Sequence, residues 1–220
     1  MKKLLLATVI SALSISAVQA APKVYGKLAV STDYVNAKEA SVVKGQKEDS
    51  NTWKVNSNAS RFGVKGEDEL TPTLSAVYQI EWGVDATDGA TLTNRNRFLG
   101  LKSTDLGTVK WGQFDTATKE SQNKVDVFND FAGESLDMKH VLTGEKRATN
   151  VIGYESPEME GLPLVVNAQL LMDESTSATA VNNNSKNGAS ISVAYKQDGI
   201  YAAVSTDYKV SHGFAAASAA

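Results

Sequence analysis

The segment 58–70, NASRFGVKGEDEL, alternates between residue types with the period of two that is typical of a β-strand. Phe62 and Val64 fall on one face of this strand, whereas Arg61 and Lys65 fall on the other. One wall of the predicted sheet is therefore apolar and the opposite wall carries cations. The fold has to provide water or a counter-charge for those cations, because a buried and unpaired charge is costly.

A second segment, NRNRFLGL at 94–101, repeats the arrangement with Arg95 and Arg97 opposite Phe98. The chain has four arginines, and the fourth, Arg147, also lies in a strand-like segment. Every arginine is thus expected on the wall of a sheet.

The first 20 residues have the organisation of a secretory signal peptide. Lys2 and Lys3 precede the apolar run Leu4–Val18, and small residues precede a predicted cleavage after Ala20. The apolar run is short for a spanning helix, which makes a membrane anchor the weaker alternative.

The composition excludes several classes of protein. Without Lys2 and Lys3 the chain has 20 Lys and Arg against 25 Asp and Glu, and this acidic balance argues against a nucleic-acid partner. The absence of cysteine means that packing or a hydrogen-bonded sheet must hold a secreted chain together, and it excludes soft-metal sites.

Alternation with a period of two recurs along the chain and predicts an all-β protein. In 74–85, LSAVYQIEWGVD, Ile80 and Trp82 share one face, and Gln79 and Glu81 share the other. The same pattern predicts about nine strands, at 23–35, 53–66, 73–85, 91–103, 107–114, 147–157, 162–173, 189–196 and 200–210.

Most of these strands are as long as the 9–11 residues that a tilted strand needs to cross a bilayer. Short turns alternate with long polar connections at about 37–52, 115–146 and 174–188. Long strands, a signal peptide and the absence of cysteine favour an antiparallel transmembrane β-barrel. A secreted β-sandwich that acts as an adhesin or binds carbohydrate is the alternative.

No pattern of catalytic or metal-binding residues is present. The two histidines, His140 and His212, are far apart and lie in loop-like segments, and no HExxH or GxSxG motif occurs. We therefore expect no enzyme, no metal and no cofactor; a barrel enzyme would need a Ser/His/Asp cluster.

In a barrel the alternation assigns the cations to the lumen. Phe62, Phe98 and Ile152 are expected to face lipid, where a cation near the midplane would cost about 2–4 kcal/mol. The opposite face then carries the predicted lumenal cations Lys27, Arg61, Lys65, Arg95, Arg97 and Arg147. Alternatively, the arginines lie on the solvent-exposed face of a sheet that is covered on one side only.

The sequence resembles the Gram-negative general diffusion porins, which are trimeric sixteen-stranded barrels of the outer membrane. VYGKLAVSTDY at 24–34 is similar to their first strand, and SRFGVKGEDEL at 60–70 to their second. NRNRFLGLKSTDLGTVKWGQ at 94–113 resembles the hairpin before their long third loop, and RATNVIGYESP at 147–157 the strand after it. The resemblance covers 21–210.

The resemblance implies a pore constriction. The wall cations of the family match Lys27, Arg61, Arg95 and Arg147. The family's third loop folds into the barrel and carries acids, which match Asp126 and Asp130 in VDVFNDFAGES at 125–135. Arg97 has no counterpart in this pattern. Cations that face loop acids create a transverse field across a narrow, water-filled opening.

The function implied is passive diffusion of small hydrophilic solutes and ions through the outer membrane of a Gram-negative bacterium. The partners implied are outer-membrane lipid, the solutes themselves and two further copies in a homotrimer.

Nine of sixteen strands would make the barrel incomplete. The domain organisation predicted is a signal peptide at 1–20, a porin barrel portion at 21–210 and an alanine-rich, non-strand tail at 211–220. An open sheet would leave unpaired edges, which hydrocarbon does not tolerate. The alternative is a smaller barrel of eight strands, in which 24–34 pairs with 189–196 or 200–210.

Overall fold

The computed structural model describes residues 21–38, 49–87, 89, 91–122, 125–127, 130, 146–158, 161–172 and 187–210. The signal peptide predicted at 1–20 and the tail predicted at 211–220 lie outside these residues. The elements are the strands β1 (Lys23–Lys27), β2 (Val30–Lys38), β3 (Asp49–Ser57), β4 (Arg61–Thr71), β5 (Leu74–Val84), β6 (Leu92–Ser103), β7 (Gly107–Asp115), β8 (Arg147–Glu155), β9 (Leu164–Leu171), β10 (Gly188–Gln197) and β11 (Ile200–Tyr208), with the helix α2 (Ala117–Gln122). No helix in the described ranges has the length and apolar character needed to span a bilayer.

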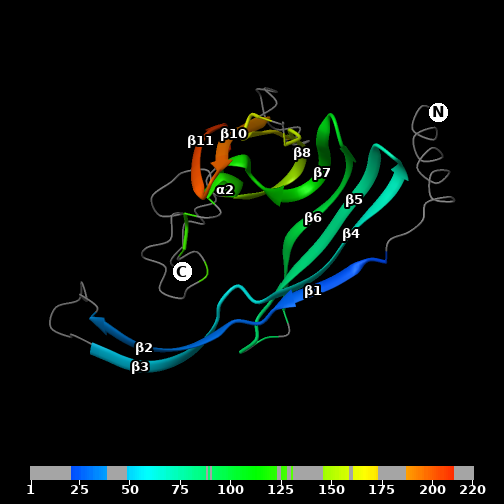
Figure 1. Cartoon of the computed structure of the whole chain (residues 1–220). Helices are drawn as coiled ribbons and strands as arrows, with labels where there is room; N and C mark the ends of the chain where they lie inside the picture. The colour runs from blue at the N-terminus through cyan, green and yellow to red at the C-terminus, as the bar shows by residue number, and fades with distance from the viewer. Residues whose placement is uncertain are drawn as a thin grey trace, which may run out of the picture.

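Nine strands form one antiparallel sheet in the order β1-β4-β5-β6-β7-β8-β9-β10-β11, and β2 and β3 form a separate two-stranded sheet. The all-β prediction is therefore confirmed. The sheet curls into an open trough, and the β2–β3 hairpin projects from one end of it (Figure 1). This single curled layer is not the pair of packed sheets that a β-sandwich requires.

The structure divides two of the predicted strands. The strand expected at 23–35 breaks between β1 and β2, and the strand expected at 53–66 breaks between β3 and β4. At the break Ala59 has a φ of 50°, and the buried hydroxyl of Ser60 accepts a hydrogen bond from the Ala29 N–H at 3.0 Å. A side chain thus replaces a rung of the backbone ladder, which lets the hairpin leave the main sheet.

The described residues show no pairing between the first and last strands of the sheet. β1 pairs with β4, and β11 pairs with β10. The alternative of a closed eight-stranded barrel, in which 24–34 pairs with 189–196 or 200–210, is therefore wrong for this structure.

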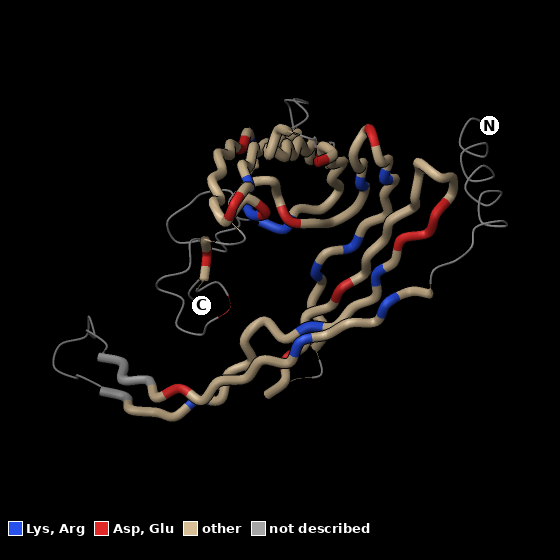
Figure 2. The backbone as a smooth tube through the Cα atoms, in the orientation of Figure 1, with Lys and Arg blue, Asp and Glu red and all other residues tan. Residues whose placement is uncertain are grey.

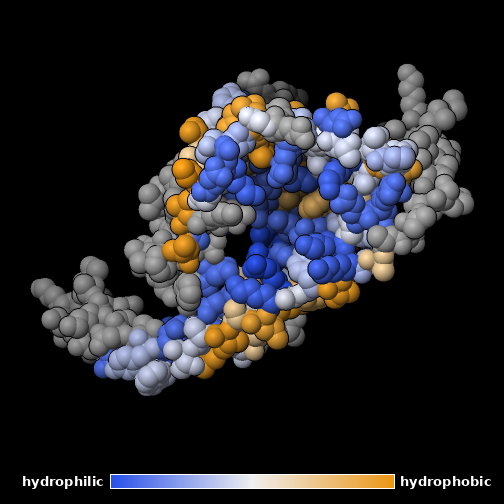
Figure 3. Space-filling view, viewed as in Figure 1, coloured by the Kyte–Doolittle hydropathy of each residue, from blue (hydrophilic) through white to orange (hydrophobic). Residues whose placement is uncertain are grey.

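The two faces of the sheet differ in polarity. The concave face is hydrophilic and the outer face carries hydrophobic side chains (Figure 3). Exposed apolar residues of the outer face occur on successive strands: Val24, Phe62, Ile80, Leu99, Trp111, Ile152, Leu170, Ile191 and Val204. Such an inside-out distribution suits a sheet with lipid on one side and water on the other.

The apolar cluster on the inner side is small. Phe114, Ala148 and Val151 are buried, and Phe98 and Leu171 pack against them. The rings of Phe98 and Phe114 meet edge to face at 6.1 Å. Cross-strand hydrogen bonds and the environment of the outer face must therefore supply most of the stabilisation of this sheet.

A β-bulge interrupts the pairing of β5 with β6. The register shifts between Ile80 and Trp82, where two residues of β6, Arg95 and Asn96, lie opposite the single residue Glu81. An extra residue in one strand reverses the inside–outside alternation of all residues beyond it.

The bulge overturns two expectations. Arg97 lies opposite Ile80 and therefore on the outer face, with its guanidinium 5.7 Å from the centroid of the Trp82 ring. Phe98 lies opposite Gln79 and therefore on the inner face. The predictions that Arg97 faces the lumen and that Phe98 faces lipid are wrong, because strict alternation cannot account for the extra residue.

Spin labels can test this reversal, because the chain contains no cysteine of its own. We expect a label at Arg97→Cys to be relaxed mainly by oxygen, which concentrates in the apolar phase. A label at Phe98→Cys should be relaxed mainly by a water-soluble nickel chelate. Labels at Leu99→Cys and Gln79→Cys provide the outer and inner references. The opposite ranking at 97 and 98 would restore strict alternation and contradict the bulge.

Candidate functional site

A polar cavity of about 580 Å³ lies on the concave side of the sheet. Its lining includes wall cations from β4, β6 and β8, the acid at the end of β7, and acids from the segment that follows β7; these residues are Arg61, Arg95, Arg147, Asp115, Glu120, Asp126 and Asp130. Figure 2 shows where Lys, Arg, Asp and Glu lie along the backbone of the sheet. Three of the four predicted wall cations and both predicted loop acids thus belong to one cavity.

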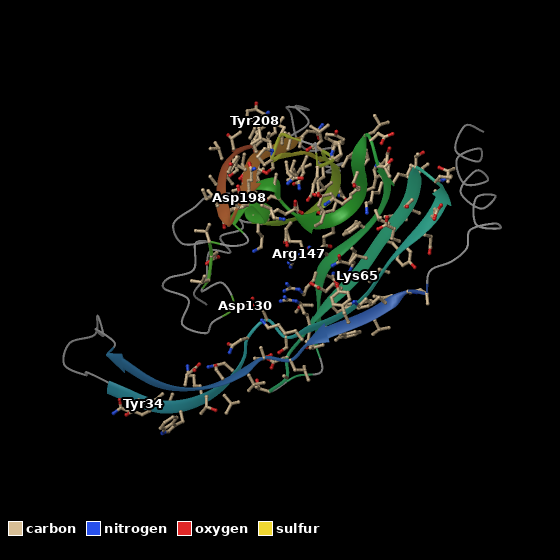
Figure 4. The ribbon with its side chains drawn as sticks, in the orientation of Figure 1. Tyr34, Lys65, Asp130, Arg147, Asp198 and Tyr208 are labelled. Carbon is tan, nitrogen blue, oxygen red and sulfur yellow. The ribbon has the colours of Figure 1, made fainter. Side chains whose placement is uncertain are left out.

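The fourth predicted cation, Lys27, contacts a loop acid directly. Its ammonium group donates a hydrogen bond to Asp130 Oδ2 at 2.7 Å, across 103 residues of sequence. Arg61 lies 4.0 Å from the same oxygen. The labelled Asp130 and Arg147 occupy the space inside the trough (Figure 4). A loop acid therefore lies in contact with the wall cations Lys27 and Arg61.

Glu81 of β5, an acid that the sequence analysis did not single out, lies close to two of the wall cations, Arg61 and Arg95. Arg95 Nε lies 2.5 Å from Glu81 Oε1, and Arg61 Nε lies 3.9 Å from Oε2. The hydroxyl of Tyr25 donates a hydrogen bond to the same carboxylate at 2.9 Å. The alternation of 74–85 already placed Glu81 opposite Trp82, so the signal was present in the sequence.

Gly63 makes the contact between Tyr25 and Glu81 possible. A Cβ added at Gly63 would lie 2.8 Å from the hydroxyl oxygen of Tyr25 and 2.7 Å from a backbone carbonyl oxygen. The glycine therefore lets the ring lie close against β4 and reach across it to β5.

Arg147 belongs to a second polar group at the start of the long connection. Its Nε donates to Asn96 Oδ1 at 2.5 Å, and its Nη2 lies 3.0 Å from Asp115 Oδ1. The amide of Asn96 donates to Asp115 at 3.2 Å. The bulge in β6 brings Asn96 to the inner face, so Arg95 and its sequence neighbour both contribute to the cavity.

Helix α2 directs the connection after β7 into the trough, where it packs against β9, β10 and β11 (Figure 1). The side-chain amide of Gln169 accepts a hydrogen bond from the Ala117 N–H at 3.0 Å and donates one to the Asp115 carbonyl at 3.1 Å. The Thr118 N–H donates to the fully buried Ser190 hydroxyl at 3.3 Å. Small and polar side chains on the inner wall thus form the seat of the helix.

Further along the helix, the Tyr201 hydroxyl of β11 donates to the Ser121 carbonyl at 2.6 Å. The segment is thereby held at both its ends. Residues 128, 129 and 131–145 lie outside the part of the chain that the structure describes.

Glu120, a half-buried residue of α2, lies against charged groups of β7 and β8. Burial raises the pKa of the Glu120 carboxyl to about 7, Lys110 at 3.8 Å opposes that shift, and Glu155 and Asp115 add to it. Lys110 also lies 3.4 Å from Glu155. This group can therefore change its charge close to neutral pH.

Asp126 also lines the cavity, but it is more buried than Asp130. The residue is 7% exposed, and its Oδ1 has no hydrogen-bond partner among the described residues. The described ranges also contain no cluster of three or more His, Asp or Glu side chains suited to a metal ion. The site as described is an electrostatic one.

Comparisons with known proteins agree with this arrangement. A family model described as Gram-negative porin matches residues 27–218. The outer membrane protein S2 of Salmonella typhi is 31% identical over 170 residues, which are 72% of this chain and 43% of that protein. The outer membrane protein YedS of Escherichia coli is 25% identical over 203 residues, 90% of this chain and 56% of that protein.

Solved structures share the fold. An anion-selective porin from Comamonas acidovorans superposes with a TM-score of 0.67 at 20% identity, over 85% of this chain and 57% of that one. The Salmonella typhi OmpF complex with daunomycin superposes with a TM-score of 0.57 at 19% identity, over 84% of this chain and 53% of that one. The chain spans about half the length of the relatives that it matches.

The two relatives are named as outer membrane proteins, and the Comamonas acidovorans protein is named as a porin. The family match extends over most of the chain, from within the first strand to beyond the last, and it includes the strands that carry the cationic wall. The chain belongs to the Gram-negative porin family.

Proposed function

We propose that this chain contributes the charged wall and the inward loop of a water-filled channel in the outer membrane, through which small hydrophilic solutes and ions diffuse passively. The observation that carries the proposal is the Lys27–Asp130 contact at 2.7 Å. It joins the first wall strand to the long connection across the concave face.

The proposed mechanism is electrostatic. Cations of β1, β4, β6 and β8 line one side of the path, and Asp126 and Asp130 of the inward connection line the other. A solute that passes between them experiences a transverse field, which favours dipolar, hydrated molecules over apolar ones. Nothing is bound covalently or transformed.

Three further elements of the proposal follow the family resemblance. The channel is a homotrimer, the residues 1–20 act as a cleaved leader, and Lys27, Arg61, Arg95, Arg147, Asp126 and Asp130 form its constriction. Small solutes and membrane lipid are then the partners, without nucleic acid.

Neutralising the loop acids should change ion selectivity. In channels formed by Asp126→Asn with Asp130→Asn, we expect the reversal potential in a salt gradient to shift toward anions. A unit charge about 4 Å from an ion in water is worth about 1 kcal/mol, so the permeability ratio should change several-fold. Asp198→Asn, in the turn between β10 and β11, is the matched control. An unchanged reversal potential in the double variant would contradict the constriction.

The titration of Glu120 predicts that ion selectivity depends on pH close to neutrality. As pH falls through about 7, the carboxyl becomes protonated and the lumen loses one negative charge. We therefore expect anion preference to rise with a midpoint near pH 7, and Glu120→Gln to remove this step. A step that persists in Glu120→Gln would assign the titration to another group.

The raised pKa of Glu120 also predicts how the free energy of unfolding depends on pH. The folded state holds the proton up to about pH 7, whereas an unfolded carboxyl releases it near the ordinary value of 4.5. The contribution of Glu120 to the free energy of unfolding should therefore fall as pH rises from about 4.5 to about 7. Denaturant titrations of the original chain and of Glu120→Gln across this range measure it; parallel pH profiles for the two proteins would show that Glu120 carries no such term.

Removing the seat of α2 should loosen the inward connection. Gln169→Leu leaves the Ala117 N–H and the Asp115 carbonyl without their partner, at a cost of about 1–3 kcal/mol for each group if it stays buried. We expect hydrogen exchange at the Ala117 and Thr118 amides to accelerate roughly tenfold or more. Gln79→Leu, elsewhere on the inner wall, should leave these amides unchanged. Equal protection in both variants would mean that Gln169 does not hold the helix.

A further inference from the structure

A second cavity, of about 450 Å³, lies on the inner wall away from the cluster of Arg61, Arg95 and Arg147. The strand register aligns four side chains across it, because Lys23 pairs with Lys65, Lys65 with Gln79, and Gln79 with Phe98. These residues come from β1, β4, β5 and β6. They form one continuous row on the concave face, and we call this row the lysine row.

The charges of the lysine row are not balanced. Lys23 and Lys65 lie directly opposite each other on neighbouring antiparallel strands, an arrangement in which like charges destabilise a sheet. Neither ammonium group forms an ion pair with a carboxylate of the described residues. The labelled Lys65 points into the open side of the trough (Figure 4).

Glu67, the carboxylate in the lining of this cavity, already pairs with a different lysine, Lys102. Both oxygens of Glu67 accept hydrogen bonds from the Lys102 ammonium, at 3.0 and 3.1 Å. Lys65 instead stands over the ring of Tyr25, 5.3 Å from its centroid. A mobile anion is therefore the group that would offset the repulsion between the two lysines.

The remaining lining is partly apolar. Val77 and the ring of Phe98 contribute to the cavity next to the lysines. Phe98 is present only because the bulge in β6 turns it inward. A ligand that combines a negative group with a flat apolar part would match both features, since the ring offers contact area and the lysines offer charge.

We propose that the lysine row is a binding subsite for small organic anions, with Lys23 and Lys65 on the carboxylate and Phe98 against the apolar part. It is separate from the acid–cation constriction. Its position on a solute path rests on the proposed function, but binding requires the sheet alone.

Benzoate is a suitable probe, tested on the full chain in detergent micelles at low salt. Reductive methylation of lysine keeps the charge and introduces methyl groups that report by NMR. We expect benzoate to shift the signals of Lys23 and Lys65 in a saturable way, and to leave that of Lys54 on the β2–β3 hairpin unmoved. Neutral benzamide should bind at least about tenfold more weakly, since a hydrogen bond between charged groups is lost.

Five variants separate the contribution of charge from that of shape. Lys23→Gln and Lys65→Gln should each weaken benzoate binding about five- to tenfold, and Lys54→Gln should not. Phe98→Leu should weaken benzoate more than acetate. Glu67→Gln, which removes the competing acid, should strengthen benzoate binding.

Shifts at Lys54 as large as those at Lys23 and Lys65 would overturn the proposal, as would equal affinities of benzoate and benzamide. Unchanged binding in both lysine variants would do the same. The measurement does not involve conduction. Failure of the channel proposal would therefore leave the subsite standing, and absence of benzoate binding would leave the channel proposal standing.

Discussion

A guanidinium or ammonium group that faces hydrocarbon near the bilayer midplane costs about 2–4 kcal/mol, and this constraint orders the whole sheet. The outer face carries exposed apolar side chains, whereas Arg61, Arg95 and Arg147 line the cavity on the concave face together with Asp115, Asp126 and Asp130. The clearest example is the ion pair between Lys27 of a wall strand and Asp130 of the inward connection, in which Nζ lies 2.7 Å from Oδ2. The arrangement also explains why so few apolar residues are buried: the interior has to remain wet.

The main departure from regular alternation is part of the site. The bulge in β6 brings Arg95 and Asn96 to the same side, so Arg95 meets Glu81 while Asn96 supports Arg147. One additional residue in a strand therefore supplies two neighbouring contacts that a regular strand could not. The same shift moves Arg97 to the outer face, over Trp82, where a cation above an aromatic ring retains a favourable interaction. It also moves Phe98 inward, where its ring joins the small apolar cluster beside Phe114.

Much of the fold could be predicted because period-two alternation directly encodes which side of a sheet a residue occupies. Lys27 and Arg61 precede any bulge, and their inward positions follow from that rule alone. Arg97 and Phe98 do not follow from it, because register depends on the partner strand and not on local sequence. The inward position of Glu81 follows from the same rule, because Glu81 alternates with Ile80 and Trp82 of the outer face. The seat of α2 on Gln169 and Ser190 could not be predicted, since it joins residues 52 and 72 positions apart through side-chain hydrogen bonds.

The central claim is that the inward connection faces the cationic wall, and zero-length carbodiimide coupling tests it without any substitution. The reagent joins an ammonium group to a carboxylate only where the two are in contact. Mass spectrometry of the assembled protein should identify a Lys27–Asp130 amide, with Lys102–Glu67 as the positive control at a comparable distance. Recovery of the control link without Lys27–Asp130, or coupling of Asp130 to Lys54 on the β2–β3 hairpin, would contradict the account.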